Sequence, residues 1–275
     1  KYDDFYIARM QWTNDSNVLS AQVLNRHQDN LDLLFIDGTT GATNVVLNEK
    51  DKAYVDVTDN LTFLNDNSYY GFDEKTNTVF YQSTENGSIN RAVYRIALNG
   101  KSKLALSKEL GTNDATFSPN FQYYINTFSS AAQPTTYALN EAKTGKQIKV
   151  IEDNAALATK LKDYNLPAKE FFVLKTEKGN ELNAWIIKPK EFDASKKYPV
   201  ANQWNSSNDY WFMMLTQQGY IVACVDGRGT GFKGADFKKV TQLELGKYEV
   251  EDQIDAAKVI GNYSFVDKSR IGIFG

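Results

Sequence analysis

A glycine-rich loop is the part of the sequence whose residue types and spacing could do chemistry. Gly229, Gly231 and Gly234 follow an apolar run with the G-x-G-x-x-G spacing of a loop that binds the pyrophosphate of a dinucleotide. Such a loop is expected to open its helix at once, whereas here A-D-F-K-K-V-T-Q-L-E-L-G intervenes before the next helical pattern. We therefore interpret the glycines as a tight loop that uses positive φ and close packing, and we predict no cofactor.

Two charged residues lie at the start of this loop. Asp226 ends the apolar run, and Arg228 follows two residues later. Opposite charges so close in sequence favour an ion pair or another contact that braces the loop. Direct contact with a substrate is the alternative role for both residues.

The residues of a Ser-His-Asp triad cannot be assembled from this chain. The single histidine, His27, lies in N-R-H-Q-D-N, which we expect to be an exposed connection between strands. Enzymes with the α/β-hydrolase order place their histidine after the nucleophile, and no serine here has the G-x-S-x-G setting. One histidine and one cysteine are too few for a zinc site. We predict neither a catalytic residue nor a metal ligand within the 275 residues.

Composition argues against two classes of function. The net charge is −3 and no basic run occurs, so a nucleic-acid partner is not expected. No apolar segment approaches the roughly 20 residues that a membrane-spanning helix needs. The only cysteine, Cys224, lies within an apolar run and is expected to be a buried small side chain.

Residues 1–152 have β patterns throughout, with turn signals between the strands. The predicted strands are Phe5–Trp12, Val18–Asn25, Leu31–Ile36, Thr43–Leu47, Thr78–Gln82, Ala92–Leu98, Lys103–Leu106, Tyr123–Phe128, Thr135–Leu139 and Gln147–Ile151. A unit of strand, glycine turn and strand recurs at 91–106 and 134–151, with starts 43 residues apart. This spacing is typical of propeller blades, which repeat about every 40–50 residues. We predict part of a β-propeller, with an irregular sandwich as the alternative.

Residues 153–275 alternate strands with helices. The predicted elements are a helix over Asp153–Tyr164, a hairpin of Phe171–Thr176 and Glu181–Lys188, a helix over Asn208–Gln218 and a strand over Ile221–Val225. This order suits the first half of an α/β-hydrolase sheet.

A helix and a strand complete the predicted sheet. Val250, Ile254 and Ala257 recur at i, i+4 and i+7 and predict the apolar stripe of the helix, whereas the acidic residues of 249–255 are assigned to its solvated face. Ile271–Phe274 is predicted to be a second buried strand, parallel to the first.

Three stretches near the C-terminus carry a family resemblance. V-D-G-R-G-T-G-F-K-G at 225–234, L-G-K-Y-E-V-E-D-Q at 245–253 and F-V-D-K-S-R-I-G-I-F-G at 265–275 resemble the serine peptidases of the prolyl oligopeptidase family, in particular its dipeptidyl peptidase IV branch. Shorter matches such as E-D-N-A-A-L, L-N-A-W-I-I-K-P and Y-Q-S-T extend the resemblance over most of the chain. It implies a β-propeller portion over 1–152, followed by the N-terminal part of an α/β-hydrolase domain over 153–275.

The resemblance also implies a function. The strand that ends at Phe274 would lead into the nucleophile elbow, with Gly275 as its first glycine and the nucleophilic serine two residues later. The expected enzyme releases N-terminal Xaa-Pro or Xaa-Ala dipeptides from peptide substrates through an acyl-enzyme. A homodimer and a periplasmic or other extracytoplasmic location are further family expectations. Two alternatives remain, a non-catalytic binding protein on the same scaffold and a sister oligopeptidase or acylaminoacyl peptidase.

Two abrupt joins predict that segments of the chain are missing. N-D-N-S-Y-Y-G-F joins two strand-like pieces near 68–70, where the family would have material comparable to one blade. The strand at Tyr198–Val200 turns straight to A-N-Q-W-N-S-S-N-D, where the family has the tyrosine of its oxyanion hole. We therefore expect an ordered subset of a longer chain, closed up near 68–70 and at 200–201.

Overall fold

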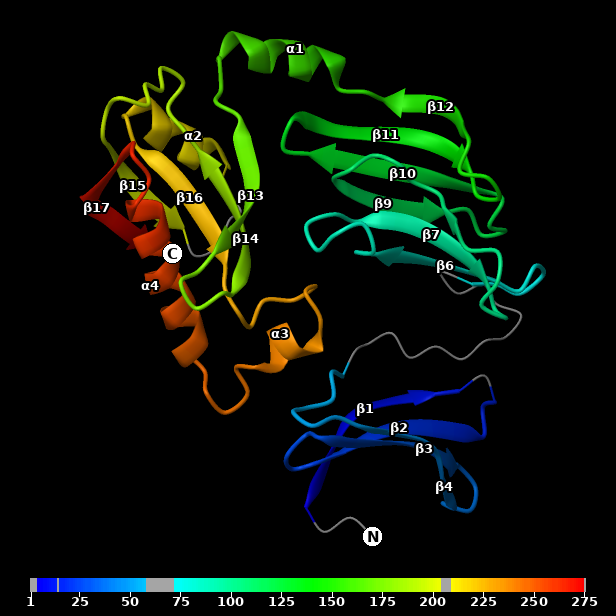
Figure 1. The fold of residues 1–275 in the computed structure, drawn as a ribbon. Coiled ribbons are helices and arrows are strands. Elements are labelled where there is room, and N and C mark those ends of the chain that lie inside the picture. Colours follow the sequence, from blue (N-terminus) through cyan, green and yellow to red (C-terminus); the bar gives the residue numbers. More distant parts are fainter. Residues whose placement is uncertain (1–3, 14, 58–71, 204–208, 275) are drawn as a thin grey trace. The chain divides into compact units, whose positions relative to one another are not determined.

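Three antiparallel sheets form the first part of the chain (Figure 1). A computed structural model describes residues 4–13, 15–57, 72–203 and 209–274. The strands are β1 (Phe5–Trp12), β2 (Val18–Asn25), β3 (Asn30–Asp37), β4 (Thr43–Lys50), β5 (Phe72–Asp73), β6 (Thr78–Ser83), β7 (Ala92–Ala97), β8 (Leu104–Ala105), β9 (Thr112–Phe117), β10 (Tyr123–Ser130), β11 (Gln133–Glu141) and β12 (Gln147–Glu152). Each sheet contains four strands, paired in chain order as in a propeller blade. Three four-stranded sheets that follow one another along the chain confirm the predicted propeller portion.

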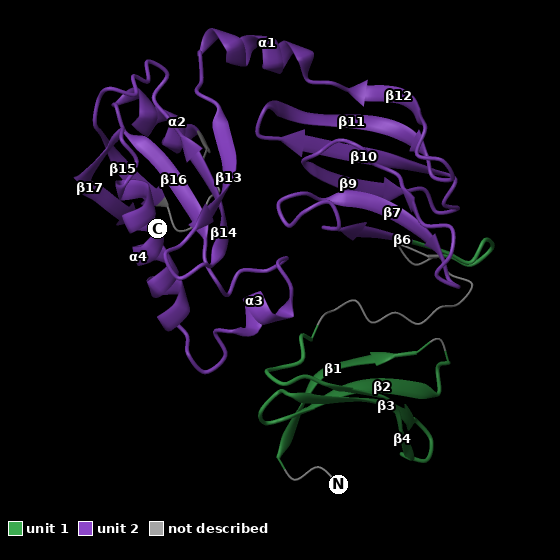
Figure 2. Ribbon diagram, in the orientation of Figure 1, with its two compact units in different colours: residues 1–79 green, residues 80–275 purple. Residues whose placement is uncertain are grey.

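The first sheet buries its two central strands. Side chains of β2 and β3 alternate between two small apolar clusters, one with Val23 and Leu34 and the other with Leu24 and Leu31. His27 lies exposed in the turn between these strands, as predicted. The chain consists of two compact units, residues 1–79 and residues 80–275, which Figure 2 shows in two colours. The sheet β1–β4 belongs to the first unit.

The third sheet is anchored by aromatic side chains. The ring of Phe117 lies 5.2 Å from that of Tyr124 and 4.6 Å from that of Phe80, measured between centroids. The hydroxyl of Tyr124, a fully buried side chain, donates a hydrogen bond of 2.9 Å to the carbonyl of Leu106. This contact satisfies the polar end of a large core residue. It also ties the third sheet to the end of the second.

A five-stranded sheet forms the second part of the chain. After helix α1 (Ala155–Asp163), its elements are β13 (Lys169–Lys175), β14 (Glu181–Ile187), β15 (Tyr198–Gln203), α2 (Asp209–Gln217), β16 (Ile221–Asp226), α3 (Ala235–Lys239), α4 (Lys247–Gly261) and β17 (Val266–Phe274). The strand order is β13-β14-β16-β15-β17. The first three strands in this order pair antiparallel, and β15 pairs parallel with both β16 and β17. This arrangement is the predicted start of an α/β-hydrolase domain.

Apolar clusters cover both faces of this sheet. On one face, Ala256 and Ile260 of α4 pack against alternate residues of β16, including Ala223. On the other face, Phe212 of α2 packs against Val222 and Cys224 of β16. A strand covered on both faces reads as a continuous apolar run, which is the pattern of β16. The helices α2 and α4 therefore lie on opposite faces.

The predicted apolar stripe of α4 is wrong. Val250 and Ile254 are 51% and 50% exposed, whereas Asp252 is completely buried and Asp255 is 5% exposed. The buried face runs through Asp252, Ala256 and Ile260, which recur at i, i+4 and i+8. Asp252 can be buried on this face because Arg228 donates hydrogen bonds to its carboxylate.

The prediction that Ile271–Phe274 is buried is also wrong. Strand β17 lies at the edge of the described sheet, and the side chains of Ile273 and Phe274 are 58% and 39% exposed. The strand itself and its parallel pairing with β15 are confirmed.

The two predicted missing segments remain predictions. The join near 68–70 lies outside the described residues. At the other join, β15 runs across Val200 and Ala201 without interruption, and Ala201 lies opposite both Val222 of β16 and Gly272 of β17. The strand therefore continues to Gln203 instead of ending at Val200.

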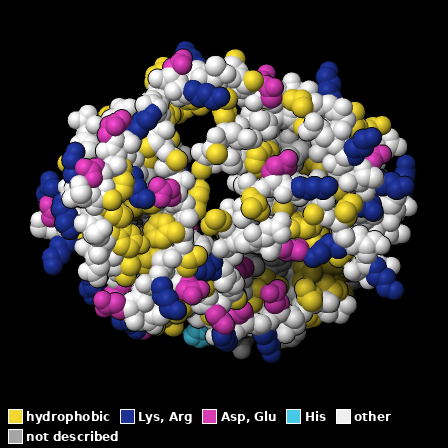
Figure 3. Space-filling view, turned by 45° about the horizontal axis from the view of Figure 1, so that its top comes forward, with side chains coloured by type: hydrophobic (Ala, Val, Ile, Leu, Met, Phe, Trp, Pro, Cys, Tyr) yellow, Lys and Arg dark blue, Asp and Glu magenta, His cyan; other side chains and the backbone are white. Residues whose placement is uncertain are grey.

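The surface in Figure 3 carries basic and acidic side chains interspersed, without a broad field of one sign. Within the described ranges, no helix is long and apolar enough to cross a membrane. Over the same residues, no three histidine, cysteine or carboxylate side chains gather as metal ligands.

Candidate active site

The carboxyl ends of three parallel strands meet at one edge of the five-stranded sheet. These ends are Gln203 of β15, Asp226 of β16 and Phe274 of β17. The strand order β16-β15-β17 reverses at β15. The chain runs from β15 through α2 to β16 on one face, and from β16 through α4 to β17 on the other. Such a switch point, outside the carboxyl ends of the strands, is where open α/β sheets bind their ligands. This edge is therefore the candidate site.

Two contacts hold the end of β17 in place. Phe274 pairs with Gln203 of β15 in the parallel ladder. Its ring meets the ring of Phe212 edge-on, with centroids 6.5 Å apart. Because Phe212 is buried in the core under α2, the last described residue of β17 is anchored to the sheet and to a helix. Gly275, the other predicted elbow residue, lies outside the described residues.

Arg228 braces the loop after β16, but its partner is not Asp226. Its guanidinium Nε donates to both carboxylate oxygens of Asp252 at 3.1 and 3.0 Å, and Nη2 donates to Asp252 Oδ1 at 2.7 Å. The backbone N–H of Arg228 donates to Asp252 Oδ2 at 2.7 Å. Asp252 is fully buried and the Arg228 side chain is 15% exposed. Hydrogen bonding to Asp252 raises the pKa of Arg228 above its usual value.

Further contacts extend this brace to the surface. Arg228 Nη2 also donates to Glu251 Oε2 at 2.5 Å, and the guanidinium lies 4.6 Å from the centroid of the Tyr248 ring. Lys178, in the turn between β13 and β14, forms an ion pair with Glu251. The buried Asp252 of α4 thus fixes the loop, while Glu251 and Lys178 link the loop to the β13–β14 hairpin.

Sequence reasoning missed Asp252, the central residue of this brace. It assigned all acidic residues of 249–255 to solvent. The available signal was the i, i+4, i+8 spacing of Asp252 with Ala256 and Ile260, together with Arg228 in the preceding loop, which was already expected to form an ion pair. The neighbouring Gln253 is buried as well, and its amide donates to the carbonyl of Val225 at 2.8 Å.

The glycines of the loop behave largely as predicted. Gly229 has φ +98°, and a Cβ there would lie 2.9 Å from Thr241 Cγ2; Gly234 has φ +94°. Gly231 has neither constraint. The expectation that no helix opens directly after the motif is wrong, because α3 begins at Ala235. This helix has five residues, and the glycines before it serve a tight turn.

Asp226 faces a pocket at the carboxyl end of β16. This edge pocket has a volume of about 460 Å³ and is lined by Ser88, Ile89, Arg91, Thr112, Asn183, Asp226, Thr230, Gly231 and Phe232. All of these residues belong to the second compact unit. Asp226 is exposed to this pocket, yet partial desolvation by the pocket walls raises its pKa, and the nearby charge of Lys233 opposes this rise. The structure thus separates the two predicted residues, since Arg228 has a bracing role and Asp226 lines a pocket.

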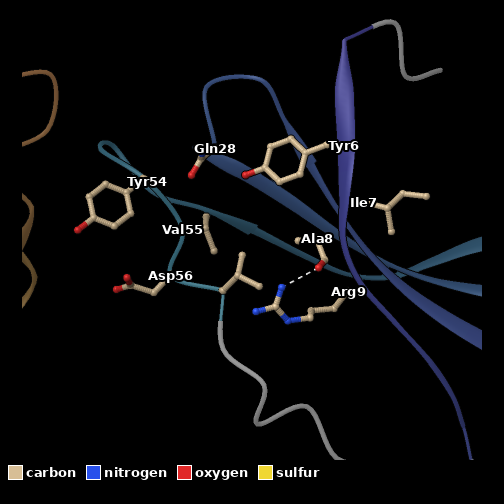
Figure 4. Close-up of a pocket in the computed structure, with 9 residues that line it drawn as sticks. Tyr6, Ile7, Ala8, Arg9, Gln28, Tyr54, Val55 and Asp56 are labelled. Carbon is tan, nitrogen blue, oxygen red and sulfur yellow. Dashed lines mark hydrogen bonds between the residues drawn. The ribbon is translucent and has the colours of Figure 1, made fainter.

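A second pocket lies on the first sheet, within the first compact unit. Residues 6–9 of β1, Gln28 and residues 54–57 line it. Figure 4 shows Tyr6 and Gln28 on one side and Arg9 and Asp56 on the other. Arg9 Nη1 donates to the carbonyl of Ala8 at 2.8 Å. All of these residues belong to the first compact unit and none to the five-stranded sheet, so this pocket is not the candidate active site.

Comparisons with known proteins identify the family. Residues 205–275 match the prolyl oligopeptidase family, and residues 1–72 and 66–135 match the dipeptidyl peptidase IV N-terminal region. A probable dipeptidyl-aminopeptidase B of Arthroderma benhamiae is 32% identical over 220 residues, which are 74% of this chain and 24% of that protein. Dipeptidyl peptidase 4 of Trichophyton rubrum is 32% identical over 219 residues, or 74% of this chain and 28% of that protein.

Solved structures agree with these matches. The crystal structure of Porphyromonas gingivalis dipeptidyl peptidase 4 superposes with a TM-score of 0.87 at 38% identity, over 99% of this chain and 45% of that one. A putative dipeptidyl aminopeptidase IV from Bacteroides ovatus has a TM-score of 0.68 at 19% identity and supports the fold alone. The chain spans about a quarter of the length of its curated relatives. It belongs to the prolyl oligopeptidase family, in the dipeptidyl peptidase IV branch.

Proposed function

We propose that the full-length protein is a serine exopeptidase that releases N-terminal Xaa-Pro or Xaa-Ala dipeptides from peptides. The observation that carries this proposal is the position of Phe274. It ends β17 at the switch point of the sheet, anchored by Phe212 and Gln203, where the family places its nucleophile elbow.

The proposed reaction proceeds through an acyl-enzyme. A serine two residues after Gly275 attacks the peptide carbonyl while a histidine takes its proton, and backbone N–H groups stabilise the resulting oxyanion. The C–N bond then breaks, and the histidine returns the proton to the leaving amine. Water hydrolyses the ester in a second, equivalent cycle. The described residues contribute the rigid platform for this serine, because β17 is paired to β15 and its last side chain packs on α2.

Three further elements of the proposal come from the family resemblance. The propeller portion ends at residue 152 and the hydrolase portion begins at 153, between the end of β12 and the start of α1. Further segments of the full-length protein lie near 68–70 and at 200–201, between residues that are adjacent in the 275-residue sequence. The protein forms a homodimer and acts in the periplasm or another extracytoplasmic compartment.

A fluorophosphonate probe and two substrates test the proposal. We expect the full-length protein to gain one adduct by intact-mass spectrometry, and the 275-residue chain, which serves as the matched control, to gain none. Full-length protein should release arylamine from Gly-Pro-arylamide and not from its N-blocked equivalent, since a dipeptidase requires the free amine. Equal turnover of both substrates would indicate a sister oligopeptidase. Absence of both adduct and turnover would indicate a binding protein on a peptidase scaffold.

A further inference from the structure

The edge pocket lies within reach of a peptide bound at the proposed nucleophile. Asp226 and Phe274 end two parallel strands that are separated only by β15. Neighbouring strands are about 4.8 Å apart, which separates β16 from β17 by roughly 10 Å. Phe274 is level with Cys224, and Asp226 lies two residues further along β16, so the two strand ends are roughly 12 Å apart. An extended peptide covers this distance in about four residues. A group that contacts Asp226 therefore belongs to a residue close to the bond that is cut.

The Asp226 carboxylate makes no side-chain hydrogen bond or ion pair with another residue that the structure describes, although Lys233 is near and Arg91 lines the same pocket. Lys233 Nζ donates to the carbonyl of Glu181 at 2.5 Å and lies 4.9 Å from the centroid of the Phe237 ring. Arg91 Nη1 donates to the carbonyls of Ser88 and Asn90, both at 3.2 Å. Both cations are thus engaged by backbone carbonyls. The carboxylate is left facing the pocket.

The remainder of the pocket suits a long basic side chain. The hydroxyls of Ser88, Thr112 and Thr230 supply acceptors for an ammonium or guanidinium group. Phe232 is 63% exposed, with the Arg91 guanidinium 3.9 Å from its ring centroid. Arg91 covers part of this ring, and the exposed remainder can pack against the apolar stem of a lysine or arginine whose charged end reaches the carboxylate.

We propose that the edge pocket is a subsite for a basic side chain of the peptide substrate, with Asp226 as the residue that determines this specificity. The inference rests on the proposed function. The α-amine of the peptide is the other cation that could pair with Asp226. That amine is present in every dipeptidase substrate, so a contact with it changes the cleavage of all peptides and not only of basic ones.

Matched peptides in full-length protein test the subsite. In one series each peptide begins Ala-Pro and carries lysine, or its neutral isostere norleucine, at one of the three positions after the scissile bond. In a further pair, lysine or norleucine replaces the alanine at the first position. We expect lysine to raise kcat/KM about tenfold at one of these positions. Asp226→Asn should reduce this preference to less than twofold. Glu177→Gln, an exposed acid in the β13–β14 turn that does not line the pocket, is the control and should keep the preference.

Three results would overturn the subsite. They are no lysine preference in the wild type, a preference that persists in Asp226→Asn, or an equal loss for lysine and norleucine peptides, which would assign Asp226 to the α-amine. The wild-type comparison decides the matter alone if Asp226→Asn does not fold. Failure of the proposed function looks different, because norleucine peptides are then not cleaved either. Calorimetric binding of the same peptide pairs, which needs no turnover, still tests the pocket in that case, and equal affinities would reject it.

Discussion

The buried pair of Arg228 and Asp252 shows how a single residue of α4 controls a loop at the active edge. Removing one partner of a buried pair leaves an uncompensated charge and costs roughly 3–5 kcal/mol, whereas exposed pairs contribute about 0–1 kcal/mol. We expect Arg228→Met to lower the free energy of unfolding by roughly 3 kcal/mol, because Asp252 is fully buried. Adding Asp252→Leu should recover part of this loss by removing the stranded carboxylate. Urea unfolding of the single and double variants measures both effects.

The outer end of the same network supplies the control. Lys178 pairs with Glu251 at the surface, and its side chain is 55% exposed. Lys178→Met should therefore cost less than about 1 kcal/mol. If Arg228→Met cost no more than Lys178→Met, the buried pair would be no more important than a surface ion pair.

Asp267 gives a prediction for pH at the start of β17. Hydrogen bonds from the Ser269 side chain and then Arg270 lower the pKa of Asp267 to about 2. A carboxylate with a lowered folded-state pKa stabilises the protein above its unfolded pKa, near 3.9, and loses this contribution as pH falls toward 2. We expect Asp267→Asn to lower Tm at pH 7, with the difference from wild type shrinking between pH 5 and pH 2.5. Glu191→Gln, in an exposed position, should show no such trend. A difference that stays constant with pH would exclude this role.

At the scale of the element, the sequence predicted strands better than faces. Strands β1 and β2 have the predicted bounds, because alternation and turn residues mark both their ends. Strand β9 was missed because T-N-D-A-T-F buries Asn113 beside Ala115, so apolar residues alone do not trace its inward face. The wrong face of α4 was predicted to be buried for the same reason, because burial of Asp252 depends on Arg228, a partner 24 residues away in the chain. Tertiary pairing of polar groups is not visible in local periodicity.

The loop between β16 and α3 offers a test of packing at glycine. A Cβ at Gly229 would lie 2.9 Å from Thr241 Cγ2, at a φ of +98°. We expect Gly229→Ala to cost more than 1 kcal/mol, and Thr241→Ser, which removes that methyl group, to relieve the steric part. Gly231→Ala is the matched control, because nothing lies within 4 Å of its Cβ position and φ is not positive. Chemical denaturation measures all the variants. Equal effects at the two glycines would show that the loop does not require glycine at 229.

At the scale of the molecule, the architecture was predictable and the site only in part. Strand spacing predicted blades, and the alternation of strands and helices predicted the hydrolase sheet. The expected elbow at Phe274 and Gly275 came from the family resemblance and not from any local pattern. The edge pocket could not be foreseen, because it joins residues 88–91 to residues 226–232. Only the folded chain brings these segments together.

The two compact units should respond separately to mutation. Cys224, the only cysteine, lies 4% exposed in β16, and burial raises its thiol pKa to about 12, so the folded sheet protects it from thiol reagents. Leu24 in the first unit and Leu182 in the second are both fully buried, and truncating either to alanine should cost roughly 2–5 kcal/mol. We expect Leu182→Ala to lower the urea concentration at which Cys224 becomes reactive. Leu24→Ala should leave that concentration unchanged while shifting part of the transition seen by circular dichroism. Equal shifts of Cys224 reactivity in both variants would mean that the chain unfolds as one cooperative unit.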